Sequence, residues 1–301
     1  HFPHSLGLFY TAITQHLGFP HYGDEGKVMA LAAFGKPTLL DRMREILVSS
    51  SRDLFRLNLD CFCHHTQGVE MTWGDESPTV GRVFSRKLEE ILGPAREPQS
   101  ELTQRHYDLA ASLQARLEEA VLELCRELHK QAPSENLALA GGVALNSVAN
   151  GLIPAKTPFR HLYIQPAAGD SGTAVGVAFY IQHQVLDRPR SFQMINAYTG
   201  PSFSEAECED ALRSAGLSYR REEDIEKITA RLLADGRIVG WFQGRMEFGP
   251  RALGNRSILA HPGLTDMKAK INARIKRREP FRPFAPSILL EFAEEWFGPR
   301  H

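Results

Sequence analysis

The chain has 301 residues, of which 43% are hydrophobic, and its 35 basic side chains nearly balance its 36 acidic ones. This length predicts about two domains with sizeable cores, and the near-neutral charge argues against an overall field that recruits nucleic acid or an anionic membrane. No apolar run approaches the roughly 18 residues of a membrane span. Four cysteines do not make a disulfide framework and suit a reducing, cytoplasmic setting.

The chain starts without methionine, on HFPHSLGLFY, which suggests a fragment or a processed product. Apolar residues at helical spacing predict a helix over residues 6–17. A second predicted helix spans residues 26–33 and is stopped by Gly35 and Pro37. The segment that follows, up to residue 98, has no clear pattern.

A long amphipathic helix is predicted to begin at a Ser100 cap and to end before Pro133. Residues 137–140 then read as a buried strand, which a glycine turn and a helix follow. The layout repeats with a strand over residues 161–165, the turn PAAGDSG and a helix over residues 173–182. Two successive strand–turn–helix units indicate an α/β layer fold.

The pattern changes near residue 190, and we place a domain boundary there. Short amphipathic helices are predicted over residues 204–215 and 224–234, and a strand lies within residues 236–244. Thr265 is predicted to cap a further short helix.

The two glycine turns are candidate binding sites, because a turn that opens a helix presents N–H donors and a positive dipole end to anions. The turn GGVALN, from Gly141, would let a nucleotide approach the backbone closely. Asp170 in GDSG would hold a cation, and the cation would hold phosphates. The alternative is two tight turns, with Asp170 as a helix cap. The residue pattern leaves both interpretations open.

Two further groups of polar residues have competing interpretations. Asp24, Glu25 and Lys27 stand at a helix start, where the dipole favours carboxylates, although adjacent acids also bind ribose or act as a general base. The motif CFCHH, which runs from Cys61 to His65, invites zinc. It lacks the C-x₂-C spacing of structural zinc sites, so we do not predict a metal there.

The segment GRMEFGPRALGNRSILAHP carries Arg245, Arg251 and Arg256 among glycines and prolines. Downstream, NARIKRREPFRPFAPS adds a serine and more cations, namely Ser287, Lys276, Arg277, Arg278 and Arg282. Guanidinium groups match phosphate oxygens bidentately, and glycines let a ligand approach the backbone. A nucleic-acid site is usually broader and leaves a clearly basic domain. The pattern therefore favours a small phosphate-bearing ligand.

Six blocks of the sequence together resemble the O-carbamoyltransferases of the NodU/CmcH type, a family that modifies nodulation factors and antibiotics. In family order they are PHSLGLFYTAITQHLGF, GDEGKVMALAAFGKP, LALAGGVALNSVAN, PAAGDSGTAVGVA, QGRMEFGPRALGNRSILA and REPFRPFAPSIL. The blocks cover nearly the whole chain, and their order makes the match specific.

The resemblance implies two domains, both incomplete. Residues 1–190 are similar to the second lobe of an actin-like (ASKHA) ATPase fold, and residues 191–301 are similar to an α+β YrdC-like domain. The YrdC-like domain of such enzymes would join carbamoyl phosphate and ATP into carbamoyl adenylate and release pyrophosphate. The actin-like domain would pass the carbamoyl group to a hydroxyl of a small-molecule acceptor.

The resemblance also implies the site residues. Asp170 matches an aspartate that ligates an iron-type divalent metal, and the implied catalytic residues are Asp24, Arg251 and Ser287. The implied nucleotide-binding positions are Asp24, Lys27, Gly141, Gly142, Asn146 and Gly169. Those for carbamoyl phosphate and the adenylate are Arg245, Arg251, Arg256, Lys276, Arg278, Arg282 and Ser287.

The sequence also departs from the family. The family starts well before PHSLGLFY, with a lobe that supplies phosphate loops and two metal-binding histidines, and it continues past EEWFG. His1 and His4 lack the H-x-x-x-H spacing, so we transfer no metal binding to them. We expect this chain alone to bind metal weakly, and a nucleotide-binding module without turnover is the rival interpretation. No nucleic-acid or membrane partner is expected, and a homodimer stays open.

Overall fold

A computed structural model describes residues 2–50, 54–74 and 77–298 of the chain. The chain divides into two compact units. The first reaches Ile164 and takes in the residues from Glu294 onward, and the second is Gln165–Ala293. The architecture is mixed α/β, and the strands of the described residues form small two-stranded sheets. The predicted boundary at residue 190 lies inside the second unit and stays a prediction.

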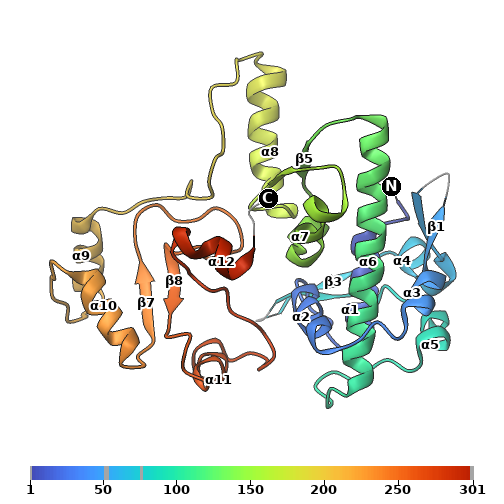
Figure 1. Ribbon diagram of the computed structural model, residues 1–301, viewed down its shortest axis with the longest axis horizontal. Helices are drawn as coiled ribbons and strands as arrows, with labels where there is room; N and C mark the ends of the chain where they lie inside the picture. The colour runs from blue at the N-terminus through green and yellow to red at the C-terminus, as the bar shows by residue number, and fades with distance from the viewer. Residues whose placement is uncertain (1, 51–53, 75–76, 299–301) are drawn as a thin grey trace. The chain divides into compact units, whose positions relative to one another are not determined.

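The described residues of the first unit form a long central helix, shorter helices and small two-stranded sheets (Figure 1). Its helices are α1 (Leu6–His16), α2 (Glu25–Leu31), α3 (Leu40–Ile46), α4 (His64–Gln67), α5 (Arg86–Leu92), α6 (Gln104–Gln131) and α7 (Ser147–Lys156). Its strands are β1 (Leu47–Ser50), β2 (Leu54–Leu57), β3 (Met71–Thr72), β4 (Thr79–Val80), β5 (Asn136–Leu139) and β6 (His161–Ile164).

The helices at the start of the chain form where the apolar spacing predicts them. Ser5 caps α1, because its hydroxyl oxygen accepts a hydrogen bond from the N–H of Leu8 at 3.3 Å. The buried face of α1 includes Phe9 and Ile13, which are fully inaccessible to solvent. Helix α2 continues as a 3₁₀ turn, Ala32–Phe34, and ends at Gly35 as predicted.

Helix α6 is the central element of the first unit and packs against α1, α2, α3 and α7. The prediction of a cap at Ser100 is wrong by three residues, because the helix begins after Thr103. The backbone N–H of Thr103 donates to Nδ1 of His106 at 2.9 Å, which closes a capping box. Leu109, Leu113 and Leu117 lie on the buried face of α6, as the sequence period predicts.

Strands β5 and β6 are parallel, in register from Asn136 opposite His161, and α7 connects them. This confirms the predicted strand–turn–helix unit. The core beneath the pair joins the end of α6 to β5, α7 and the start of β6 through Leu122, Cys125, Leu137, Ile153 and Phe159. Strands β5 and β6 therefore pack on a hydrophobic core, and the glycine turn follows the carboxyl end of β5.

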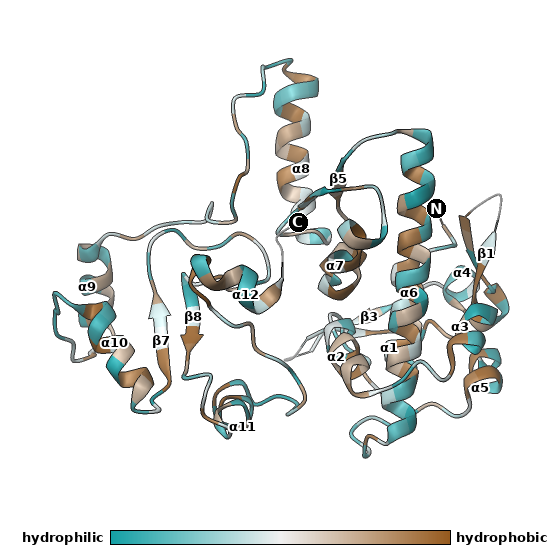
Figure 2. Cartoon of the chain, viewed as in Figure 1, coloured by the Kyte–Doolittle hydropathy of each residue, from teal (hydrophilic) through white to brown (hydrophobic). Residues whose placement is uncertain are grey.

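The second unit begins with a 3₁₀ turn, Asp170–Gly172, that leads into α8, a helix of mainly hydrophobic residues (Figure 2). The elements of this unit are α8 (Thr173–Tyr180), α9 (Glu205–Ser214), α10 (Ile225–Ala234), β7 (Val239–Phe242), β8 (Arg256–Leu259) and α11 (Met267–Lys270). Helix α12 (Ala293–Phe297) begins at the last residue of this unit and otherwise belongs to the first. Strands β7 and β8 form an antiparallel pair. The predicted cap at Thr265 is wrong by one residue, because Asp266 holds that position.

Across the described ranges, none of the helices combines the length and the apolar character that a bilayer span requires.

Candidate functional site

The predicted acidic helix start is a buried ion pair. The Asp24 side chain lies at the beginning of α2, and the residue is only 5% exposed. One carboxylate oxygen accepts the N–H of His21 at 3.0 Å, and the other lies 2.9 Å from Nζ of Lys27. The Lys27 ammonium also stands over the ring of Phe19, 5.6 Å from its centroid. Asp24 and Lys27 therefore fix the turn before α2 through each other.

The glycine turn after β5 has an open outer side. Gly141 adopts φ +97°, a region that favours glycine, whereas the φ of Gly142 is not in that region. A Cβ atom added at either residue would meet no other atom within 4 Å. Neither packing nor φ requires glycine at position 142. A ligand that approaches the backbone closely would explain this residue.

Asn146 joins the glycine turn to α7 and to α6. Its Oδ1 accepts the N–H of Ala149 at 3.0 Å, which makes it the cap of α7. Its side-chain amide also exchanges two hydrogen bonds with Gln114 of α6, at 2.9 and 3.1 Å. The residue is 8% exposed. These contacts are internal, and the predicted nucleotide contact of Asn146 stays a prediction.

The GDSG turn is shaped by a close backbone contact. A Cβ atom at Gly172 would lie 2.1 Å from the carbonyl oxygen of Ala167, so packing requires this glycine. Gly169 precedes the 3₁₀ turn, and exposed Asp170 opens it, with its carbonyl oxygen accepting the hydroxyl of Thr173 at 2.6 Å. The predicted role of Gly169 in nucleotide binding stays a prediction.

The described residues around Asp170 do not fit a bound metal. Within residues 2–50, 54–74 and 77–298, no three His, Cys, Asp or Glu side chains gather into a group that could hold an ion. Asp170 is a single exposed carboxylate, and iron-type centres take several protein ligands. We therefore derive no step through a metal.

The arginine-rich loop is closed around a buried carboxylate that sequence reasoning missed. The side chain of Glu247 is inaccessible to solvent. One of its oxygens accepts the N–H groups of Leu253 and Asn255 at 2.6 and 2.8 Å. The other accepts Nε–H of Arg256 at 2.9 Å, and the Glu247 carbonyl accepts Nη2–H of the same guanidinium at 2.9 Å. Arg256 therefore points inward and holds the loop together.

The ionisation of Glu247 follows from these contacts. Burial alone would raise the pKa of this carboxyl, but the hydrogen bonds from Arg256 and from the N–H groups of Leu253 and Asn255 outweigh burial and lower it to about 2. The carboxylate is therefore ionised throughout the physiological range. The only sequence signal for this role is an acid standing alone among arginines.

Several other predicted phosphate ligands are held by the second unit itself. Arg245 donates to the carbonyl oxygens of Gly200 and Thr199, each at 3.0 Å. Arg278 donates to Oδ1 of Asn272 at 2.8 Å and stacks over the ring of Phe284. Arg282 lies 3.8 Å from the carboxylate of Glu279. The predicted ligand contacts of these three arginines stay predictions.

Arg251, Lys276 and Ser287 differ from that set. All three residues are exposed. Their side chains form no hydrogen bond or ion pair with any residue that the structure describes. Arg251 lies between Glu247 and Leu253, so the bond between those two residues closes the segment that carries it. Arg251 is thus a cation on a braced loop, available to an anion from outside.

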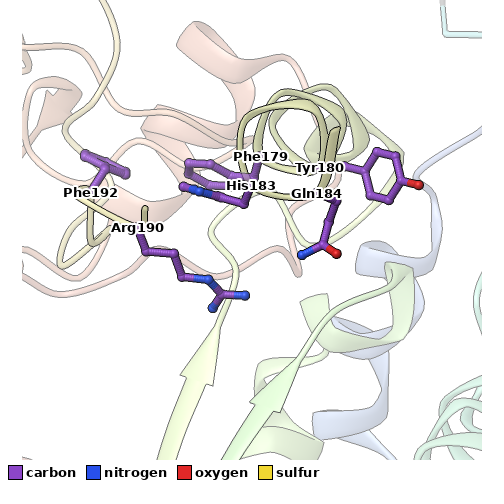
Figure 3. Close-up of a pocket in the computed structure, with 7 residues that line it drawn as sticks. Phe179, Tyr180, His183, Gln184, Arg190 and Phe192 are labelled. Carbon is purple, nitrogen blue, oxygen red and sulfur yellow. The ribbon is translucent and has the colours of Figure 1, made fainter. Parts of the chain in front are cut away.

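A separate pocket of about 400 Å³ lies beside the end of α8 (Figure 3). The Phe179 ring stacks with the rings of His183 and Phe192, whose centroids lie 5.9 and 6.0 Å away. The lining residues are Gly176, Phe179, Tyr180, His183, Gln184, Arg190 and Phe192. The lining contains none of the predicted site residues, and we assign it no ligand.

The chain matches two family models in order. The model described as the carbamoyltransferase N-terminus matches residues 1–179, and the model described as the carbamoyltransferase C-terminus matches residues 230–301. The chain therefore belongs to the carbamoyltransferase family, which confirms the resemblance to the NodU/CmcH type.

Its relatives include proteins from several bacteria. The uncharacterized protein sll1178 of Synechocystis sp. is 44% identical over 99% of this chain and 48% of its own length. The nodulation protein NolO of Bradyrhizobium diazoefficiens is 38% identical over 97% of this chain and 50% of its own length. The 3'-hydroxymethylcephem-O-carbamoyltransferase of Amycolatopsis lactamdurans is 30% identical, over 91% and 46%. The chain thus spans about half the length of these relatives.

Proposed function

We propose that the chain is the portion of an ATP-dependent O-carbamoyltransferase that binds nucleotide at the glycine turn and forms carbamoyl adenylate on the arginine-rich loop. The observation that carries the proposal is the state of Arg251 and Lys276. They are exposed, and their side chains have no partner among the described residues, whereas Arg256 is held inward by Glu247. Such uncommitted cations suit phosphate oxygens, and of the two Arg251 lies on the loop that Glu247 braces, whereas Lys276 ends the helical segment Ile271–Lys276.

The proposed reaction follows from atom balance. Carbamoyl adenylate contains only the α-phosphate of ATP, so the phosphate of carbamoyl phosphate leaves separately, with one water consumed, and carbamate remains. A carbamate oxygen then attacks the α-phosphorus of ATP, and pyrophosphate leaves. Finally the acceptor hydroxyl attacks the carbamoyl carbon, loses its proton and displaces AMP.

Different residues of this chain act in different steps of the proposed reaction. Arg251 and Lys276 bind the phosphates and offset the negative charge that develops at the α-phosphorus, and Ser287 positions the carbamoyl group. Backbone N–H groups after Gly141 and Gly142 bind nucleotide phosphates in the first unit. Asp24 and Lys27 hold the turn before α2. There Asp24 binds the ribose hydroxyls or accepts the proton of the acceptor hydroxyl.

The fold, acceptor and compartment are also part of the proposal. We assign the actin-like and YrdC-like folds to residues 1–190 and 191–301. The printed name of the Amycolatopsis relative describes transfer to a hydroxymethyl group, and we extend that class here as a small molecule with a hydroxyl. The thiols of Cys61, Cys63, Cys125 and Cys208 are free, which agrees with the cytoplasm. A metal at Asp170 is left out.

The test is product release by the purified chain. Wild-type protein incubated with ATP and carbamoyl phosphate should release pyrophosphate and phosphate in equal amounts. Arg251→Ala should abolish release, whereas Arg274→Ala, at an exposed cation of the same unit outside the predicted set, should not. Nucleotide binding without pyrophosphate would instead identify a binding module.

A further inference from the structure

Gln114 is a buried residue of α6 whose side-chain hydrogen-bonding capacity is completely used. It is 5% exposed. Its Oε1 accepts Tyr10 Oη–H at 3.1 Å and Asn146 Nδ2–H at 2.9 Å. Its Nε2 donates to Asn146 Oδ1 at 3.1 Å and to Glu118 Oε1 at 2.9 Å. A carboxamide has two donors and accepts twice at its oxygen, so nothing remains unpaired.

These bonds fix the orientation of Asn146, and Asn146 fixes the turn. The backbone N–H of Asn146 donates to the carbonyl oxygen of Val143 at 2.9 Å, inside the 3₁₀ turn that begins at Gly142. Its Oδ1 also caps α7. One turn later, Asn150 Nδ2 donates to the carbonyl oxygen of Ala144 at 2.8 Å. The glycine turn is therefore tied to α6 through a single pair of amides.

We propose that Gln114 is the positioning residue of the glycine turn, and that through Asn146 it holds the Gly141–Gly142 backbone in the conformation that accepts nucleotide phosphates. The inference rests on the proposed nucleotide role of that turn. Gln114 itself touches no ligand. It acts on the N–H groups of a turn whose outer side is open, because a Cβ atom at Gly142 would meet nothing within 4 Å.

The chemistry of the pair explains why glutamine is needed. A glutamate at position 114 would keep the two acceptor contacts but lose both donors, and it would face Asn146 Oδ1 and Glu118 with a negative charge. Acid reverses part of this loss, because a protonated carboxyl regains one O–H donor. Burial and the neighbouring Glu118 carboxylate raise the pKa of such a carboxyl toward neutrality.

The experiment compares Gln114→Glu with Glu118→Gln. The second variant keeps an acceptor for Gln114 Nε2 and leaves the contacts of Asn146 unchanged. ATP affinity is measured by calorimetry at pH 8 and pH 6, and amide hydrogen exchange is followed over residues 141–146. In Gln114→Glu we expect about tenfold weaker ATP binding at pH 8, partial recovery at pH 6 and faster exchange in the turn. Glu118→Gln should match wild type.

Each outcome decides one of the two proposals. If wild-type protein binds no ATP, the proposed function fails, and the exchange of residues 141–146 alone decides the role of Gln114. If wild type binds ATP and Gln114→Glu binds it equally well, or if the turn exchanges at an unchanged rate, the positioning role is wrong and the proposed function stands. If Glu118→Gln weakens ATP binding as much as Gln114→Glu does, the loss belongs to the packing of α6, and the inference is also overturned.

Discussion

The sharpest consequence of the structure concerns Glu247, which we would replace by glutamine. The substitution keeps one oxygen for the N–H groups of Leu253 and Asn255 but turns an NH₂ group toward Nε–H of Arg256. The charge-assisted hydrogen bond from Arg256 is lost, and the hydrogen bonds from Leu253 and Asn255 now reach a neutral acceptor. Since a hydrogen bond to a charged group contributes about 1.5–3 kcal/mol and a neutral one about 1 kcal/mol, the lost bond and the two weakened ones should together cost the loop at least about 2 kcal/mol.

The assay is amide hydrogen exchange at Leu253 and Asn255, because a chain of two units need not unfold in one step. A loss of at least about 2 kcal/mol corresponds to exchange faster by roughly 30-fold or more. Glu205→Gln is the matched control. Glu205 is 84% exposed and pairs with Arg221 at 3.2 Å, so its loss should cost less than about 1 kcal/mol. Equal exchange at Leu253 and Asn255 in wild type and Glu247→Gln would refute the bracing role.

The pH dependence of the loop gives an independent check with a definite sign. The folded-state pKa of Glu247 is lowered to about 2 from the ordinary 4.5. A carboxyl whose pKa is lowered in the folded state stabilises the fold at any pH above its ordinary pKa. This stabilisation is lost as the pH falls from about 4.5 toward 2. Wild type should lose protection at Leu253 and Asn255 over that window. Glu247→Gln should lack this acid-dependent step, and an identical profile in both proteins would argue against the assignment.

Three further substitutions test the first unit. Gly142→Ala should leave the stability of the first unit, measured by amide hydrogen exchange in α6, unchanged or raise it by about 0.5 kcal/mol, while ATP affinity measured by calorimetry falls at least tenfold. Gly35→Ala should destabilise the first unit by about 3 kcal/mol or more in the same exchange assay, because its Cβ atom would lie 2.0 Å from the carbonyl oxygen of Tyr107. Asp24→Asn should cost about 1–3 kcal/mol there, since it leaves the Lys27 ammonium without its buried partner.

The parts of the fold that sequence reasoning predicted are those with a strong period. Phe9 and Ile13 of α1, and Leu109 and Leu113 of α6, are buried because their spacing leaves them on one helix face. The parallel pairing of β5 and β6 follows from strands joined by a helix. The first residues of helices are predicted less accurately, because several neighbouring residues have side chains that can cap a helix. Which of them does so depends on contacts such as the hydrogen bond from Thr103 to His106.

The candidate site shows a similar division. Residue types predicted a cationic loop and a glycine turn, and both exist. Sequence alone does not say which cations are already paired, because Arg251 and Arg256 look equivalent until their partners are known. Gln114 gave no signal at all, since a polar residue on a helix reads as surface until the amide of Asn146 is seen against it.

The loop also shows why glycine beside arginine does not by itself mean ligand approach. Gly249 has φ +112°, and a Cβ atom there would lie 2.8 Å from the carbonyl oxygen of Pro166, so the path of the chain requires this glycine. Arg256 likewise has a structural role, because its hydrogen bond to Glu247 closes the loop. The proposed phosphate-binding role is therefore assigned to Arg251 and Lys276, whose side chains are exposed and have no partner among the described residues. Replacing Arg251 should remove ligand contacts without loosening the loop, and replacing Arg256 should loosen the loop first.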